Sequence, residues 1–127
     1  MLTGTAYTAM VPVRDVARAK DFYENTLGLK GAGDTMDGGY AFTTADGHQL
    51  ALLPDPDGRP TGRTMLSFEV PDLGAEVNAL EGAGVAFEDY DTPGLKTENH
   101  IAAMEGESAA WFSDTEGNIL CLHTVTS

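Results

Sequence analysis

The sequence predicts an α+β fold built from two tandem βαβββ modules, and three observations carry this prediction. A polar turn with a central Gly leads into a short apolar strand twice, at 46–53 and at 114–123. A β-like stretch ends in a Val two residues before a helix-capping Asp twice, at Asp15 and at Asp72. Nearly equal intervals then separate each of these aspartates from the Gly that ends the helix, so both halves follow one order of elements.

The first half, 4–57, contains every element of one module. Asp15 is placed to cap a helix over 16–27, and Gly28 supplies the left-handed residue that ends it. Short β-rich stretches predict the strands of this half, at 5–13, 29–32, 40–44 and 48–53. These elements together make one βαβββ unit.

The second half, 62–125, repeats this order after a linker at 54–60, whose three prolines cannot pair in a sheet. A helix is predicted at 73–82, and the strands of this half are predicted at 64–70, 85–90, 109–113 and from the turn to 125. The second half is the longer one, and its extra residues fall between Phe87 and Trp111. We therefore expect a long loop at 91–108, a candidate lid, since loops of this length often carry function.

The size and charge of the chain limit the classes of protein to consider. At 127 residues it predicts a single domain, 1–127, with halves too small to fold alone. Twenty acidic residues against seven basic ones give a formal net charge of −13, which disfavours nucleic acid and anionic membranes as partners. No membrane-spanning apolar run or signal peptide is visible, and a single cysteine fits a reducing compartment, so a cytoplasmic location is expected.

No motif for covalent catalysis is recognisable. The chain has no Gly-x-Ser-x-Gly elbow, no phosphate-binding loop with Lys, and no Cys-x-x-Cys pair. Cys121 and His123 would share one face of a strand, but no third group is placed to orient the imidazole. The sequence alone therefore does not predict a nucleophilic mechanism.

The two βαβββ units and the motif Trp-Phe-Ser-Asp-Thr-Glu-Gly-Asn at 111–118 resemble the vicinal oxygen chelate superfamily. This superfamily includes glyoxalases, bleomycin-resistance proteins, fosfomycin-resistance enzymes and extradiol dioxygenases. The resemblance covers residues 4–125 and implies the glyoxalase/bleomycin-resistance fold, in which cupped mixed sheets enclose a cavity. It does not by itself choose among the activities that this fold supports.

Metal-dependent relatives place His, Gln or Glu ligands on the first and last strands of each half. The resemblance maps those positions onto Thr8, Ala51, Met65 and Cys121, none of which is an imidazole or a carboxylate. A shift of register could instead offer His48 or Gln49 in the first half and His123 in the second. Because a divalent site needs three or four donors that converge, we expect no metal and no other cofactor.

Side chains that share a strand face with those four positions are candidates to line the cavity. Strand alternation adds Leu53, Ala109 and Ile119 to the polar candidates, and the resemblance adds Trp111, which either stacks a planar or cationic ligand or is an ordinary core residue. A carboxylate at Glu69 would hold a cationic group or lie in solvent. The predicted ligand-binding residues are Thr8, Met10, Thr43, Gln49, Ala51, Met65, Ser67, Glu69, Tyr90, Lys96, His100, Trp111, Cys121 and His123.

Three hypotheses of function follow. The first is a metal-independent binding protein similar to bleomycin-resistance proteins, which holds an aromatic or cationic small molecule and forms a homodimer, with antibiotic resistance as its role. The second is a glyoxalase-type lyase or isomerase, either metal-dependent or using Glu69, His100 or His123 as acid and base. The third is a protein whose inward side chains fill the cavity themselves.

Overall fold

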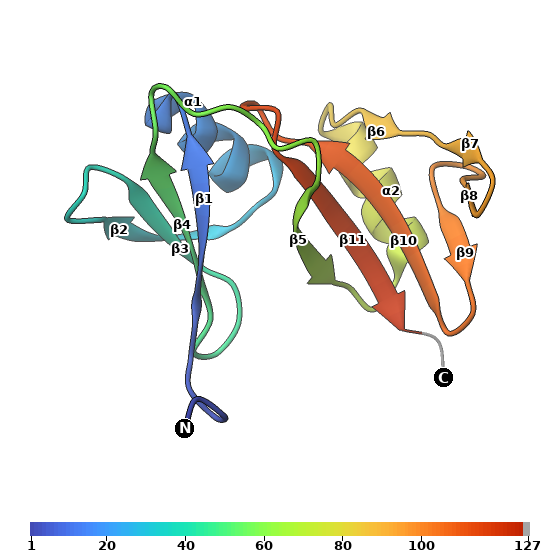
Figure 1. Ribbon diagram of the computed structural model, residues 1–127, viewed down its shortest axis with the longest axis horizontal. Coiled ribbons are helices and arrows are strands. Elements are labelled where there is room, and N and C mark those ends of the chain that lie inside the picture. Colours follow the sequence, from blue (N-terminus) through green and yellow to red (C-terminus); the bar gives the residue numbers. More distant parts are fainter. Residues whose placement is uncertain (126–127) are drawn as a thin grey trace. The chain divides into compact units, whose positions relative to one another are not determined.

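The computed structural model describes residues 1–125 and consists of two compact units. The first unit covers Met1–Arg59 and the second begins at Pro60. The first unit has the order βαβββ, and the second unit has the same order with short extra strands inserted between β6 and β10. This arrangement confirms the predicted α+β fold of two tandem modules (Figure 1).

The first unit forms a four-stranded sheet in the order β1-β4-β3-β2. The edge strand β1 pairs with β4 in parallel, and the other neighbours are antiparallel. The elements are β1 (Thr8–Val13), α1 (Val16–Asp21), the π-helical turn η1 (Phe22–Thr26), β2 (Lys30–Asp34), β3 (Tyr40–Thr43) and β4 (Gln49–Pro54). The first strand begins three residues later than predicted. The Tyr7 carbonyl still accepts from the N–H of Gln49 at 3.4 Å, whereas the Thr5 N–H donates to the Leu2 carbonyl at 3.1 Å and closes a turn.

The helix of the first unit begins where the sequence predicts. The Asp15 carboxylate accepts a hydrogen bond from the backbone N–H of Arg18 at 3.0 Å, which satisfies one free donor of the first turn. The last part widens into a π-helical turn, in which the N–H of Leu27 donates to the carbonyl of Phe22 at 3.0 Å. Gly28 then ends the helix with φ of +76°.

Tyr23 lies in that π-helical turn and is fully buried against Phe42, with ring centroids 6.1 Å apart. The same core contains Val11, Val13, Leu50 and Leu52. Their strand neighbours point to the other face, so the unit has one helix-covered face and one open face.

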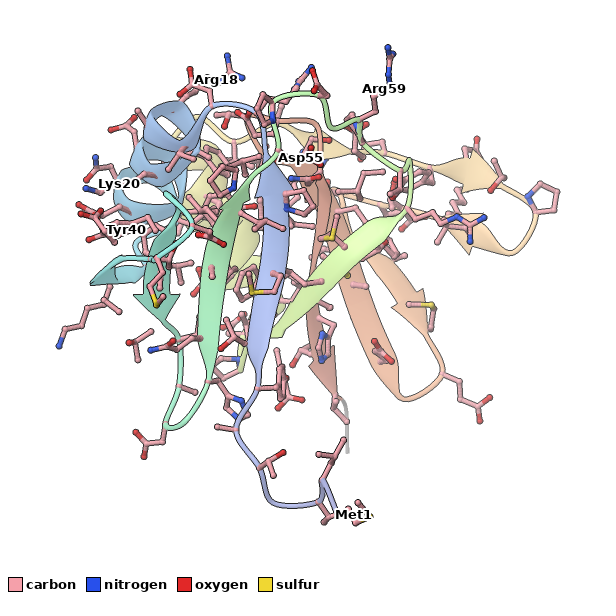
Figure 2. All side chains as sticks on the ribbon, turned by 60° about the vertical axis from the view of Figure 1, so that its left-hand side comes forward. Met1, Arg18, Lys20, Tyr40, Asp55 and Arg59 are labelled. Carbon is pink, nitrogen blue, oxygen red and sulfur yellow. The ribbon has the colours of Figure 1, made fainter. Side chains whose placement is uncertain are left out.

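Close packing around β3 requires glycine at two positions. A Cβ on Gly39 would collide with the backbone carbonyl of Leu52, which cannot move away. A Cβ on Gly31 would collide with the hydroxyl of Tyr40, whose ring also receives the ammonium group of Lys20, 4.2 Å from the centroid (Figure 2). This cation–π pair fastens the end of α1 to β3.

The second unit forms a five-stranded sheet in the order β5-β11-β10-β6, with β9 also paired to β10. Strand β5 runs parallel to β11, as β1 does to β4 in the first unit. The elements are β5 (Thr64–Glu69), α2 (Leu73–Gly82), β6 (Phe87–Glu88), β7 (Asp91–Thr92), β8 (Leu95–Lys96), β9 (Ala102–Met104), β10 (Glu107–Ser113) and β11 (Ile119–Val125).

The prediction of a long loop at 91–108 is wrong. These residues form the β7–β8 hairpin and strand β9, and β10 already begins at Glu107. The inserted chain thus pairs its backbone groups with one another and with β10, as most ordered chain must. The predicted strand 85–90 is shorter in the structure, at Phe87–Glu88, because only these two residues of β6 pair with β10.

The turn between β10 and β11 is built by a buried aspartate. One carboxylate oxygen of Asp114 accepts from the backbone N–H groups of Glu116 at 2.8 Å and Asn118 at 2.9 Å, and the other accepts from the Asn118 amide at 3.0 Å. Gly117 adopts φ of +84°, and a Cβ there would lie 2.8 Å from Pro60. This turn fixes the register of β10 against β11, and through it the positions of the side chains on both strands.

Within residues 1–125, no helix is long and apolar enough to cross a membrane.

Candidate functional site

The open face of the second unit's sheet carries most of the polar and aromatic candidates. Helix α2 packs against β10 and β11, and Ala110, Phe112, Leu120 and Leu122 are buried on that side. Their alternate neighbours point to the opposite side. We call this opposite side the polar face and define it by Ser67, Glu69, Glu88, Tyr90, Trp111, Cys121 and His123.

Strand pairing arranges the polar face in two rows across the sheet. In the first row Ser67 lies opposite Cys121, Cys121 opposite Trp111, and Trp111 opposite Glu88. In the second row Glu69 lies opposite His123, which lies opposite Ala109. Since facing residues in neighbouring strands point to the same side, each row brings its side chains together.

His123 connects the two rows. Its Nδ1 lies 2.5 Å from the hydroxyl oxygen of Ser67, and its Nε2 lies 3.6 Å from a carboxylate oxygen of Glu69. The imidazole is 20% exposed, whereas the Glu69 side chain is 72% exposed. A half-buried base therefore lies between a hydroxyl and a solvated carboxylate.

Trp111 and Tyr90 form an aromatic corner at the other end of the first row. Their ring centroids are 5.5 Å apart and the rings are nearly perpendicular, at 89°. Burial first, and then the negative charge of Glu88, raise the pKa of Tyr90, so its phenol keeps its proton and remains a donor at neutral pH. Trp111 is only half-buried, so part of its ring can be reached from outside.

Cys121 lies in the middle of the first row but is almost completely buried, at 5% exposure. Burial raises the pKa of its thiol, and the smaller opposing effect of the neighbouring Ser67 does not cancel this rise. The group is therefore a thiol rather than a nucleophilic thiolate at neutral pH.

The structure places His100 on the helix side of the sheet and thus apart from the polar face. Its Nδ1 lies 2.8 Å from Asp89 and its Nε2 3.0 Å from Glu81 of α2, and its ring stacks on Phe87 at 5.8 Å. The hydrogen bond to Asp89 raises the pKa of His100 against the opposing effect of burial. This imidazole clamps the inserted segment to α2.

The chain between β6 and β10, residues 89–106, is the inserted segment, and hydrogen bonds also hold its first residues in place. The backbone N–H of Tyr90 donates to the Thr97 hydroxyl, and the N–H of Thr97 donates to the Tyr90 carbonyl, each at 2.9 Å. Lys96 lies in this short hairpin, opposite Asp91 and outside the main sheet. The segment therefore holds Tyr90 in place beside Trp111 instead of hanging free as a lid.

The candidates of the first unit share one face of its own sheet. Thr8 lies opposite Gln49 and Gln49 opposite Thr43, while Met10 lies opposite Ala51. Ala51 is buried at 4% exposure, and the other four are exposed. This face presents neutral side chains and brings no acid or base together.

His48 lies next to Gln49 in the chain but contacts Tyr7, with ring centroids 4.8 Å apart, and its buried Nδ1 has no hydrogen-bond partner among the described residues. In the second unit Met65 lies at an irregularity in the pairing of β5 with β11. Among residues 1–125, no group of three or more His, Cys, Asp or Glu side chains converges so as to hold a metal ion. The donor set therefore does not fit the divalent centre that the resemblance implies for metal-dependent relatives.

Sequence reasoning missed three acidic groups that matter to this geometry. Glu88 lies beside Trp111 only because β6 pairs with β10, and Asp89 and Glu81 meet at His100 only because the inserted segment folds back on α2. The pairing of Ser67 with His123 links residues far apart in the chain. The repeat suggests how β5 pairs with β11, and a prediction of that register could have found the contact between Ser67 and His123.

The chain belongs to the Glyoxalase/Bleomycin resistance protein/Dioxygenase superfamily, whose family model matches residues 6–122. No curated protein matches this chain. These results confirm the resemblance and the glyoxalase/bleomycin-resistance fold.

Among solved structures, a superfamily member from Sphaerobacter thermophilus DSM 20745 is 27% identical, with a TM-score of 0.76 over 98% of this chain and 99% of that one. TnmS3, an antibiotic binding protein from Streptomyces sp. CB03234, is 26% identical, with a TM-score of 0.71 over 99% of both chains. The fosfomycin resistance protein FosX from Listeria monocytogenes shares the fold at 14% identity, with a TM-score of 0.71 over 99% of this chain and 94% of that one.

Proposed function

We propose that this protein binds a small aromatic or cationic molecule on the polar face, without a metal ion. The observation that carries the proposal is the half-buried Trp111, which stands edge-on to Tyr90 and directly opposite Glu88. A flat ring can stack on the accessible part of the indole, and a phenol held beside it can donate a hydrogen bond.

Charge supports a cationic ligand. Glu88 and Glu69 both belong to the polar face, and the chain as a whole carries a formal net charge of −13. An aromatic face next to carboxylates attracts a positively charged group through both the ring quadrupole and the carboxylate charge. A neutral aromatic ligand would use only the stacking.

The relatives agree with a binding role. TnmS3 carries the description of an antibiotic binding protein and is more than one quarter identical over nearly the whole of both chains. We therefore propose small antibiotics with planar rings as the first class of ligands to screen, and resistance by sequestration as the biological role. The resemblance to the superfamily further suggests a homodimer in the cytoplasm, and light scattering of the purified chain tests the dimer.

The test is a titration with proflavine, a planar aromatic cation, and with a neutral anthraquinone. We expect quenching of the single Trp, and calorimetry should show that Trp111→Ala weakens binding by about 1–3 kcal/mol, or roughly 5- to 150-fold. The control is Tyr7→Ala, which removes an exposed aromatic ring from the first unit and should leave the affinity unchanged.

Two results would contradict the proposal. Equal affinity of wild type and Trp111→Ala would remove the aromatic corner from the site. One tightly bound divalent ion per chain, measured by elemental analysis of protein purified without chelator, would replace metal-independent binding by metal-assisted chemistry.

A further inference from the structure

The polar face also brings a hydroxyl, an imidazole and a carboxylate close together. We propose that Ser67, His123 and Glu69 form an acyl-transfer site that accepts the acyl group of activated esters. This activity goes beyond the binding proposed above, because it depends on Ser67, His123 and Glu69 near the β5 edge of the polar face. The proposed binding depends instead on the aromatic corner of Trp111 and Tyr90.

The geometry has the three parts that an activated serine needs. The Ser67 hydroxyl lies 2.5 Å from Nδ1 of His123, within hydrogen-bond reach of its base. Glu69 lies two residues further along the same strand and directly opposite His123, so parallel pairing places hydroxyl and carboxylate on either side of one imidazole. A nucleophile, a base and a group that orients the base are the diagnostic arrangement, whatever the fold.

The carboxylate selects the imidazole tautomer that the reaction requires. Nδ1 can take the serine proton only when Nε2 carries the ring hydrogen, and Nε2 is the nitrogen that lies 3.6 Å from Glu69. The negative charge of Glu69 favours that N–H and stabilises the imidazolium that forms after proton transfer. The ring is used in the sense opposite to that of the chymotrypsin triad, in which the acid holds Nδ1 and the serine faces Nε2.

Ser67 is also more accessible to a substrate than Cys121, the other potential nucleophile of the polar face. Ser67 is exposed, whereas the neighbouring Cys121 is almost fully buried and stays a protonated thiol. The backbone carbonyl of His123 accepts from the N–H of Val70 at 2.8 Å, which holds the end of β5 and the base on β11 together. The serine is therefore the group that an ester meets first.

The reaction balances without a cofactor. The Ser67 oxygen bonds to the ester carbonyl carbon while its proton passes to His123 Nδ1, and the bond from carbon to the leaving oxygen then breaks as that oxygen takes the proton. Water attacks the acyl-serine in the same way, and Ser67 recovers a proton from His123. The products are a carboxylic acid and an alcohol or phenol, and phenyl esters suit the site because a phenol leaves easily.

The experiment uses the full chain and p-nitrophenyl acetate. We expect a burst of p-nitrophenol and one acetyl group per chain, mapped to Ser67 by peptide mass spectrometry. Ser67→Ala should abolish the burst, and His123→Gln should slow it at least tenfold. Glu69→Gln should slow it less, because the exposed carboxylate acts only through the imidazole.

Controls separate a chemical role from a folding role. Ser113→Ala removes another serine of the same sheet, opposite Ile119, and should react like wild type. Thermal melts of all variants show which of them fold. Absence of acetylation in the folded wild type, or acetyl groups only on lysine, the N-terminus or Cys121, would overturn the proposal while leaving the binding of planar ligands untouched.

Discussion

The two units share one backbone plan and differ in what their open faces carry. In both, the first strand pairs in parallel with the last. A buried phenylalanine, Phe42 of β3 or Phe112 of β10, lies on the helix side of each sheet. The pair Glu69 and His123 in the second unit corresponds to Pro12 and Leu53 in the first, when the modules are aligned by their helix caps and turn glycines. The repeat therefore preserves the fold, while the residues on one face differ between the units.

A second difference lies next to the same face. Trp111 lies opposite Cys121 in the second unit, and the corresponding pair in the first unit is Ala41 and Ala51. Only the second unit has the inserted segment that fastens Tyr90 beside this position. The larger side chain and the insertion thus occur together, and together they form the aromatic corner.

The largest expected effects on stability come from substitutions of the buried phenylalanine that each unit has in its core. Phe42→Ala and Phe112→Ala should each lower the free energy of unfolding by about 3–5 kcal/mol, because both rings are completely buried and leave a cavity. Urea denaturation followed by circular dichroism measures the loss. A small effect at only one of the two positions would show that the cores are not equivalent.

Substitutions in the two corresponding turns should have effects of intermediate size on the free energy of unfolding, and these effects should differ between the units. Asp114→Ala removes an acceptor of two backbone N–H groups and an amide, and should cost about 1–3 kcal/mol. Thr44 holds the corresponding position in the first unit, where two backbone bonds close the turn: the Thr44 N–H donates to the His48 carbonyl at 3.3 Å, and the His48 N–H donates to the Ala45 carbonyl at 2.9 Å. Thr44→Ala is the matched control, and we expect its effect to stay within about 0.5 kcal/mol. Equal losses at both positions would contradict this difference between the turns.

His100 makes the stability of the second unit depend on pH. Its pKa is raised in the folded protein by the hydrogen bond to Asp89, so the protonated imidazole binds its partners more strongly than the neutral one. The stabilisation is fully present below about pH 6.5, the unfolded value, and is lost as pH rises through the raised folded pKa.

The stability advantage of wild type over His100→Gln should therefore shrink between mildly acidic and mildly alkaline pH. Denaturation curves at a series of pH values measure it, and an NMR titration of His100 reports its pKa directly. In Asp89→Asn the pKa of His100 should move back down. A pKa that stays the same in this variant would rule out Asp89 as the main cause.

The repeat made most of the fold predictable. Both capping aspartates, the order of elements in each half and the alternation of faces are local or periodic properties, and the structure has them where the sequence indicates. The π-helical turn before Gly28 was not predicted, because its wider hydrogen bonding depends on how Tyr23 fits beneath Phe42. Packing of this kind leaves no periodic signal in the sequence.

The site was only partly predictable. Strand alternation predicted that Ser67, Glu69 and His123 share a face, and the resemblance added Cys121 and Trp111. Glu88 of the same face was missed, and the role of all these residues in ligand binding stays a prediction. The sequence placed Cys121 and His123 on one face of a strand with no third group to orient the imidazole, whereas the structure pairs that imidazole with Ser67 of the neighbouring strand. His100 was grouped with Lys96 in a loop, yet its contacts depend on an insertion that folds back onto α2. Contacts across strands depend on register, which a single sequence specifies weakly for inserted chain.

The most direct test of the account is to ask which unit a planar cation contacts. Proton–nitrogen correlation spectra of the full chain, recorded as proflavine is added, report this residue by residue. We predict that the largest shifts fall on the Trp111 indole and on the backbone of Ser67, Glu88 and Cys121. Shifts confined to Thr8, Thr43 and Gln49, on the open face of the first unit, would contradict the claim that the second unit carries the site.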